Sequence, residues 1–223
     1  NNRGIFEESG KMKVTIIYDN TTSRVDLEAD WGFSALVESK TRKILFDTGA
    51  DGRILLSNMQ RLKINPKGIK DIFISHLHWD HTGGLSSFLE VNNQVKLWIP
   101  SYLPEAKSVK EVFEVKKPTK LYEGIYSTGE LEGIEQSLCV ETKKGIVIVV
   151  GCSHPRIEHI LMTASQFGEV YGIIGGLHAN RPQALRNLCL VCATHCTQYK
   201  SEIKSLYPEK YIEGGAGKII EVE

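Results

Sequence analysis

The segment 75–82 reads Ser-His-Leu-His-Trp-Asp-His-Thr and places three histidines and one aspartate within six positions. In an extended segment His76 and His78 point to the same side, so both imidazoles can reach one ion. A turn directly after His78 then directs Asp80 and His81 toward a second ion close by. Imidazole combined with carboxylate suits Zn, Fe, Mn or Ni. The chain has only seven histidines in 223 residues, so this density favours a metal site over a surface loop that happens to be rich in histidine.

The other histidines lie mostly at the ends of apolar segments that are typical of buried strands. These segments and their histidines are 145–150 with His154, 170–174 with His178, and 191–194 with His195. Loops at strand ends are held by a rigid scaffold, which is the arrangement that converging metal ligands need. The exception is His159, which falls inside a predicted helix and is expected to be a surface or packing residue.

The elements that must position these side chains are short apolar, β-branched runs alternating with amphipathic segments. The pattern predicts strands at 13–18, 33–38, 43–47, 71–75, 95–99, 119–126, 136–142, 145–150, 170–174 and 191–194. It predicts helices at 51–62, 83–90, 155–166, 182–190 and 199–206, the first with a one-sided apolar stripe that faces a sheet. The polar stretch 101–120 is expected to be a solvated edge rather than a loop or insertion over the active site.

The pattern His-x-His-x-Asp-His resembles the motif of the metallo-β-lactamase superfamily of metal-dependent hydrolases, and other stretches extend this resemblance over nearly the whole chain. They are 43–49 (Lys-Ile-Leu-Phe-Asp-Thr-Gly), 145–155 (ending in Gly-Cys-Ser-His-Pro) and 193–197 (Ala-Thr-His-Cys-Thr). Gly-Cys-Ser-His, the Gly-Gly-Leu-His of 175–178 and the late His-Cys-Thr are similar to one branch of the superfamily. That branch includes dihydropterin-(ribofuranosyl)aminobenzene phosphate synthases of the methanopterin pathway.

The resemblance implies an α/β (α+β) fold, a four-layer αββα sandwich, in agreement with strands and helices interspersed through both halves of the chain. We expect one domain over 12–223, preceded by a leader or flexible N-terminus at 1–11. The resemblance also implies that His76 and His78 hold a first ion, while Asp80, His81 and His195 hold a second.

The sequence departs from the usual superfamily pattern at two places. Residues 127–137 contain no Gly-His motif, where the superfamily usually supplies a third histidine, and Cys152 stands where the bridging aspartate is usual. His154 can supply the missing imidazole, and His178 is either another ligand or a hydrogen-bond donor to substrate. We therefore expect one or two divalent ions, zinc first, with Fe, Mn or Ni as alternatives.

Three further side chains have candidate roles around these ions. Asp80 either binds the second ion or accepts a proton from water whose pKa the ion lowers toward about 7. Asp80 and His178 are the candidate catalytic residues. Asp47 follows a strand and either holds loop amides or a ligand histidine's N–H, or is an ordinary turn aspartate. Cys152, beside the metal ligands, is the thiol expected to matter by supporting them.

Two weaker patterns have alternative interpretations. Cys189, Cys192 and Cys196 form C-x2-C-x3-C, which can bind Zn or an Fe–S cluster. We favour instead a helix end at Cys189 and a strand start at Cys192, whose side chains point apart into apolar surroundings. Gly83-Gly84 allow close backbone approach and can leave free N–H groups for an anion.

Composition narrows the class of function. The 27 basic and 27 acidic residues balance, so no global field favours nucleic acid or a membrane surface. No apolar run approaches the roughly 20 residues that span a bilayer, and five cysteines, an odd number, argue for a reducing cytoplasm. We expect a metal-dependent hydrolase of a phosphoester, lactone or related small molecule, including a pterin phosphate. The alternatives are an iron-dependent oxidoreductase of oxygen or sulfur compounds and a non-catalytic metal-binding sensor module.

Overall fold

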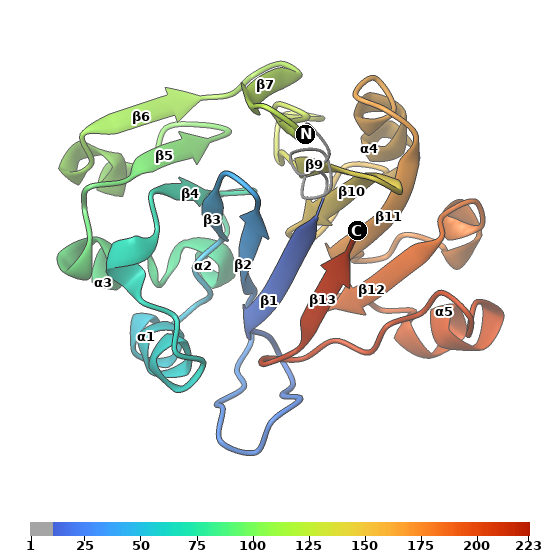
Figure 1. Ribbon diagram of the computed structural model, residues 1–223, viewed down its shortest axis with the longest axis horizontal. Coiled ribbons are helices and arrows are strands. Elements are labelled where there is room, and N and C mark those ends of the chain that lie inside the picture. The colour runs from blue at the N-terminus through green and yellow to red at the C-terminus, as the bar shows by residue number, and fades with distance from the viewer. Residues whose placement is uncertain (1–10) are drawn as a thin grey trace, which may run out of the picture.

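The computed structural model describes residues 11–223 as two β-sheets packed face to face (Figure 1). The first sheet has seven strands, in the spatial order β13 (Ile219–Val222), β1 (Met12–Tyr18), β2 (Ser34–Ser39), β3 (Lys43–Phe46), β4 (Asp71–Phe73), β5 (Lys96–Ile99) and β6 (Glu111–Glu114). The second has six, in the order β12 (Leu190–Thr194), β11 (Val170–Gly176), β10 (Gly145–Val150), β9 (Leu138–Thr142), β8 (Ile125–Ser127) and β7 (Thr119–Tyr122).

Each sheet has an antiparallel part and a parallel part. Strands β13, β1, β2 and β3 pair antiparallel, whereas β3 to β6 pair parallel. In the second sheet β7 to β10 pair antiparallel, and β10, β11 and β12 pair parallel. The parallel strands β10 and β12 are buried along almost their whole length, which explains their continuous apolar sequences. The carboxyl ends of parallel strands lie at the same edge, and this edge carries the histidines.

Helices cover the outer face of each sheet, which completes four layers (Figure 1). The first sheet is covered by α1 (Gly52–Arg61) and α3 (Leu85–Val91). The short α2 (Trp79–Thr82) follows the loop at the carboxyl end of strand β4. The second sheet is covered by α4 (Ile157–Ala164) and α5 (Lys200–Leu206). Three 3-10 helices occupy Pro66–Gly68, Pro104–Ser108 and Pro182–Leu185. The expected αββα sandwich is confirmed.

Three apolar clusters hold the layers together. One joins the inner faces of the sheets, with Phe46 and Phe73 from the first and Val149 from the second. The other two lie under the helices, and α1 contributes to one of them through Leu55 and Met59. The side chain of Asp51 accepts hydrogen bonds from the N–H groups of the first turn of α1, so the predicted amphipathic helix starts where its cap requires.

Several predicted elements differ from the structure. The single strand expected at 119–126 is the hairpin β7–β8, because the chain turns at Gly124, which has φ of +69°. The helix expected at 182–190 is wrong beyond its first turn, since only Pro182–Leu185 is helical and β12 begins at Leu190. Strands β6 and β13 were not predicted. All four residues of β6 are exposed, so it has no buried apolar face, and β13 has only four residues, too few to show a clear pattern. β6 is an edge strand, which agrees with the solvated edge expected at 101–120.

The leader or flexible segment expected at 1–11 lies, except for Lys11, outside the described residues, and the single domain at 12–223 stays a prediction. Among the helices within 11–223, none has the length and apolar character needed to cross a membrane.

Candidate metal centre

Six histidines meet where the carboxyl ends of the parallel strands of both sheets face one another. The loop after β4 carries His76, His78 and the start of α2, and the turn after β10 carries His154. The strands β11 and β12 end just before the loops of the two remaining histidines. Loops on rigid strand ends thus bring together ligands from distant parts of the chain.

The first cluster consists of His76, His78 and His154, whose ligand nitrogens lie within 4.8 Å of one another. His76 is buried, His154 is half-buried and His78 is exposed, so the cluster opens to solvent on one side. The centroid of the His154 ring lies 4.8 Å from that of the His76 ring and 4.7 Å from that of the His78 ring. The structure therefore brings a third imidazole beside His76 and His78, and its role as a ligand stays a prediction.

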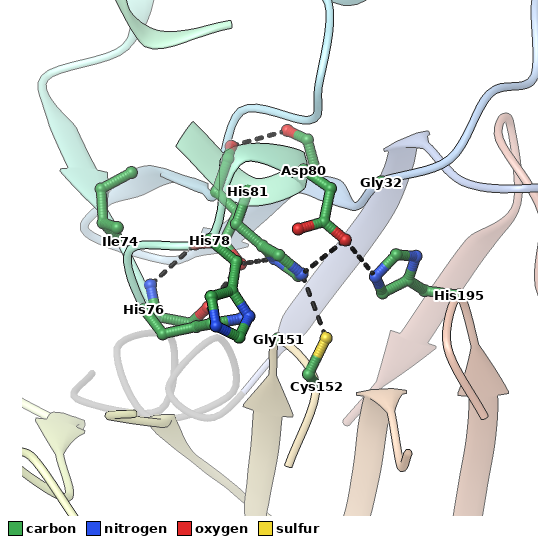
Figure 2. A network of polar contacts seen from close by, with 12 residues as sticks. Gly32, Ile74, His76, His78, Asp80, His81, Gly151, Cys152 and His195 are labelled. Atoms are coloured by element: carbon green, nitrogen blue, oxygen red, sulfur yellow. Dashed lines mark hydrogen bonds and ion pairs between the residues drawn. The ribbon is translucent and has the colours of Figure 1, made fainter. Parts of the chain in front are cut away.

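The second cluster consists of Asp80, His81 and His195, and all three residues are buried. Figure 2 shows the Asp80 carboxylate between the two rings. Its Oδ2 lies 3.2 Å from His195 Nε2 and 3.8 Å from His81 Nε2. One carboxylate and two imidazoles form a ligand set suited to a divalent transition metal.

Cys152 lies between the two clusters, with its Sγ 3.2 Å from His81 Nε2 (Figure 2). Its sulfur groups with His76 and His81 on one side, and with His195 and Cys196 on the other. The thiol therefore lies beside candidate ligand atoms of both clusters, and its role there stays a prediction.

The C-x2-C-x3-C segment does not converge. Cys189 is exposed and Cys192 is buried, and within residues 11–223 neither belongs to a group of candidate ligands. The expected helix end at Cys189 is wrong because that helix is absent there, and Cys189 is not in apolar surroundings. Only Cys196 approaches the histidines.

Asp47 holds the loop after β4 and one histidine of the second cluster. It is fully buried, and its Oδ1 accepts a hydrogen bond from Ser75 N–H at 2.7 Å. Its Oδ2 lies 2.6 Å from Ser75 Oγ and 2.7 Å from His81 Nδ1. With hydrogen on Nδ1, the lone pair of His81 Nε2 faces Asp80 and Cys152. The structure thus gives Asp47 both contacts proposed for it, a loop amide and a ligand histidine.

Residues in the loop before β2 support the second cluster, and no sequence pattern pointed to them. The Oδ1 of Asn20 lies 2.9 Å from His195 Nδ1, and Asp19 Oδ1 accepts a hydrogen bond from His195 N–H at 2.8 Å. The indole N–H of Trp31 donates to Asp80 Oδ2 at 2.9 Å. Each side chain of the second cluster therefore has a polar partner that fixes its orientation.

Burial sets the charges of the two clusters. It lowers the pKa of His76 and of His81 to about 3, so both rings are neutral near pH 7 with lone pairs available. Burial raises the pKa of Asp47 to about 8. Burial also acts to raise the pKa of Asp80, but the hydrogen bond with His195 and the charge interaction with His81 hold it below its usual value. Asp80 is therefore ionised.

The donors in the clusters fit a metal ion. Within the described residues, the Nε2 atoms of His76 and His154 are buried and have no hydrogen-bond partner. Buried polar nitrogens without a partner cost free energy, and a coordinated ion removes that cost.

His178 lies beside the clusters rather than in them. Its ring centroid is 5.0 Å from that of His154, but it belongs to none of the candidate ligand groups found in residues 11–223. The structure therefore does not place it among the metal ligands, and a contact to substrate is the alternative that remains. His159 pairs with Glu132 at 3.1 Å, away from the clusters, as expected.

Gly83 and Gly84 serve packing and not anion binding. Gly83 N–H donates to Trp79 C=O at 2.8 Å, and Gly84 N–H donates to Gly49 C=O at 3.2 Å. Side chains at either position would collide with the backbone of 48–50. The close approach was expected, but these two N–H groups are not free for an anion.

Comparisons with known proteins identify the family of this chain. A sequence model of the Metallo-beta-lactamase superfamily matches residues 32–118. A 7,8-dihydropterin-6-methyl-4-(beta-D-ribofuranosyl)-aminobenzene-5'-phosphate synthase of Methanocaldococcus jannaschii is 30% identical, over 85% of this chain and 89% of its own length. This chain belongs to the metallo-beta-lactamase superfamily. The superfamily resemblance seen in the sequence is thereby confirmed.

Solved structures extend the likeness. A metal-dependent hydrolase of the beta-lactamase superfamily has a TM-score of 0.78 and 25% identity, and the match covers 95% of this chain and 99% of that one. Zinc-bound PqqB from Methylobacterium extorquens has a TM-score of 0.63 and 9% identity, with 94% and 100% covered, and is alike in fold. For this superfamily member, the individual ligand assignments stay predictions.

Proposed function

We propose that this chain is a metal-dependent hydrolase of a small-molecule phosphoester, lactone or related ester. The observation that carries the proposal is the convergence of two ligand clusters around Cys152, with buried imidazole nitrogens that lack partners. A non-catalytic sensor module would need only the metal ligands and no opening for a substrate. The open side of the first cluster, at exposed His78, also leaves room for a substrate to approach.

The residues that would hold metal are those of the two clusters, with His76, His78 and His154 for one ion and Asp80, His81 and His195 for the other. When bound, a divalent ion supplies Lewis acidity and lowers the pKa of water toward about 7, so that hydroxide forms at neutral pH. One or two ions, zinc first, are our expectation.

Two side chains have roles beyond holding metal. Asp80 is ionised and fixed by Trp31, so it can accept and release a proton near the reacting water, or bind the second ion. His178 lies next to His154 with a buried Nδ1 that has no partner within the described residues. Both features support a role in which its ring donates a hydrogen bond to an oxygen of the substrate.

The relatives give a substrate class. The archaeal relative is named as the synthase of a dihydropterin-linked ribofuranosyl phosphate, a name that gives the product of that enzyme and supports pterin-linked phosphates as a class of compound to test as substrates here. The balanced charge of the chain supports a small-molecule substrate over a nucleic acid.

The first experiment is elemental analysis of protein purified without added metal, followed by hydrolysis assays with aryl phosphodiesters, phosphomonoesters and lactones. We expect one or two zinc, manganese or nickel ions per chain, and hydrolysis that a chelator removes and added metal restores. Protein that binds no divalent metal and hydrolyses no ester would contradict the proposal. One iron per chain with oxygen consumption would favour the oxidoreductase instead.

A further inference from the structure

The turn that follows β10 carries Cys152 and His154 to the clusters but contains no regular secondary structure. Ser153 adopts φ of +56°, in the left-handed region that non-glycine residues rarely occupy. A side chain at Gly151 would collide with Ser75 Oγ, so the turn is pressed closely against the loop of the histidine motif. Something must stabilise this strained and crowded turn.

The carboxylate of Glu135 fills the concave side of the turn and accepts four consecutive backbone N–H groups. Its Oε1 lies 3.0 Å from Gly151 N, 3.0 Å from Cys152 N and 3.1 Å from Ser153 N. Its Oε2 lies 2.9 Å from His154 N. Successive N–H groups of this kind form an anion-binding concavity, and here a fully buried side chain of the same chain is the anion.

Glu135 also contacts the other half of the centre. Its Oε2 lies 4.0 Å from Nδ1 of the buried His76. The next residue, Gln136, donates its backbone N–H to Ser75 C=O at 2.9 Å and its side-chain amide to Ile74 C=O at 2.9 Å. The segment around Glu135 therefore joins the loop after β4 to the turn after β10.

We propose that Glu135 is a positioning residue for the metal centre, which orders the turn so that His154 completes the first cluster. The inference rests on the proposed metal-dependent function. Glu135 lies in the stretch 127–137, where the sequence lacks the histidine that the superfamily usually supplies. In this chain that stretch contributes a carboxylate that places a histidine from elsewhere.

The chemistry requires a carboxylate and not an amide. Both oxygens of Glu135 accept, whereas glutamine offers one oxygen and one NH2 group. If the glutamine oxygen replaces Oε1, the NH2 group faces His154 N–H, and two donors then oppose each other. The substitution Glu135→Gln should therefore displace His154 with little change in side-chain volume.

The experiment is a titration of metal-stripped protein with Co(II), followed by calorimetry and by the ligand-field absorption of the bound ion. The variants are Glu135→Gln, His154→Ala, the double variant, and Glu132→Gln as the matched control. Glu132 lies in the same loop but is exposed and pairs with His159, away from the clusters.

We expect Glu135→Gln to weaken one Co(II) step by about 10- to 100-fold, the range for residues that orient metal ligands, and to alter the absorption spectrum. Glu132→Gln should match the wild type. Because Glu135 acts through His154, adding Glu135→Gln to His154→Ala should weaken that step no further. Wild-type Co(II) binding by Glu135→Gln, or additive losses in the double variant, would overturn the inference.

Glu135→Asp keeps both oxygens and serves if Glu135→Gln does not fold. A folded Glu135→Asp with a weakened Co(II) step supports the positioning role. Wild-type Co(II) affinity in Glu135→Asp, or failure of this variant to fold as well, overturns it. If the wild type itself binds no Co(II), the proposed function fails. If the wild type binds Co(II) and the Glu135 variants bind it equally tightly, this inference alone fails.

Discussion

The two ligand clusters differ in how their side chains are held. In the second cluster, His81 is bonded to Asp47, His195 to Asn20, and Asp80 to Trp31. In the first cluster His76 Nδ1 lies 2.9 Å from Ser75 Oγ, whereas His78 is exposed and, within the described residues, the rings of His78 and His154 have no such polar contact. The second cluster also contains a carboxylate, and the first contains only imidazoles.

This difference indicates that the two clusters differ in metal affinity and in access for a substrate. A buried anionic site whose ligands are already oriented loses little conformational freedom when it binds an ion. A site made of neutral rings that opens to solvent binds an ion less tightly and leaves room for substrate. We therefore expect the second cluster to bind metal more tightly than the first. The predictions below test that comparison, beginning with the largest effect.

Asp80→Ala should have the largest effect, because it removes the only carboxylate of the second cluster. We expect the fold to be retained, one bound ion to be lost, and kcat to fall by about 10²- to 10⁴-fold, the range for a positioned acid–base group. Steady-state kinetics and elemental analysis check this. Unchanged activity would remove Asp80 from the mechanism and, with unchanged metal content, would remove the difference between the clusters.

Asp47→Asn should weaken the second cluster without touching an ion directly. Above its raised pKa of about 8, the Asp47 carboxylate accepts a hydrogen bond from His81 Nδ1–H, whereas the amide NH2 would face Nδ1, favour the tautomer with hydrogen on Nε2 and turn that hydrogen toward the ligands. Metal affinity at one step should fall by about 10- to 100-fold, measured by calorimetry. An affinity equal to that of the wild type would show that the orientation of His81 does not distinguish the clusters.

His154→Ala should affect the first cluster alone, and His159→Ala, in the following helix α4, is its matched control. The first variant removes one of three imidazoles and should lose the weaker ion while the tighter ion stays bound. His159 pairs with Glu132 and should be neutral for metal content. Loss of the tighter ion in His154→Ala would reverse the proposed order of affinities.

The smallest effect concerns a feature that both clusters share. Each contains a histidine whose pKa is strongly lowered by burial, His76 in the first cluster and His81 in the second. Burial lowers the pKa of His76 and His81 to about 3, against about 6.5 for an unfolded histidine. Below about pH 6.5 the unfolded chain binds more protons than the folded one, so the free energy of unfolding of the metal-free protein should decrease as pH falls.

Asp47 acts in the opposite direction, because its pKa is raised to about 8 and the folded chain keeps its proton between about pH 4 and 8. Burial also raises the pKa of Asp19 and lowers that of His154, so three histidines oppose two carboxyls and a net loss of stability on acidification remains below about pH 6. Urea unfolding of metal-stripped protein at several pH values measures it. Stability that stays level or rises from pH 6 to 5 would contradict the expectation.

How far the sequence predicted this centre depends on the range of the contacts. His76, His78, Asp80 and His81 lie within one short segment, so their types and spacing alone indicated a site. His154 and His195 were predicted because each follows an apolar strand. Fold class followed from the alternation of strands and helices, although the short strands β6 and β13 carried too little apolar pattern to be found.

The supporting residues were harder to predict because their contacts are made across the fold. Asn20 meets His195, a residue far along the chain, and Glu135 meets four backbone groups on another strand end. Asparagine and glutamate are common in loops, and no local pattern separates these two from their neighbours. Only the pairing of the strands brings them to the centre.

The pairing of β13 with β1 has a consequence for biosynthesis. Val14 lies opposite Ile220, so an early strand of the chain is completed by one of its last. Until residues 219–222 have left the ribosome, the outer edge of β1 has no β13 to pair with, and Ile220 is missing from the core between the sheets. Contacts so distant in sequence close slowly. The first sheet is therefore complete only once residues 219–222 have joined it, and until then the unpaired edge of β1 can pair with other chains.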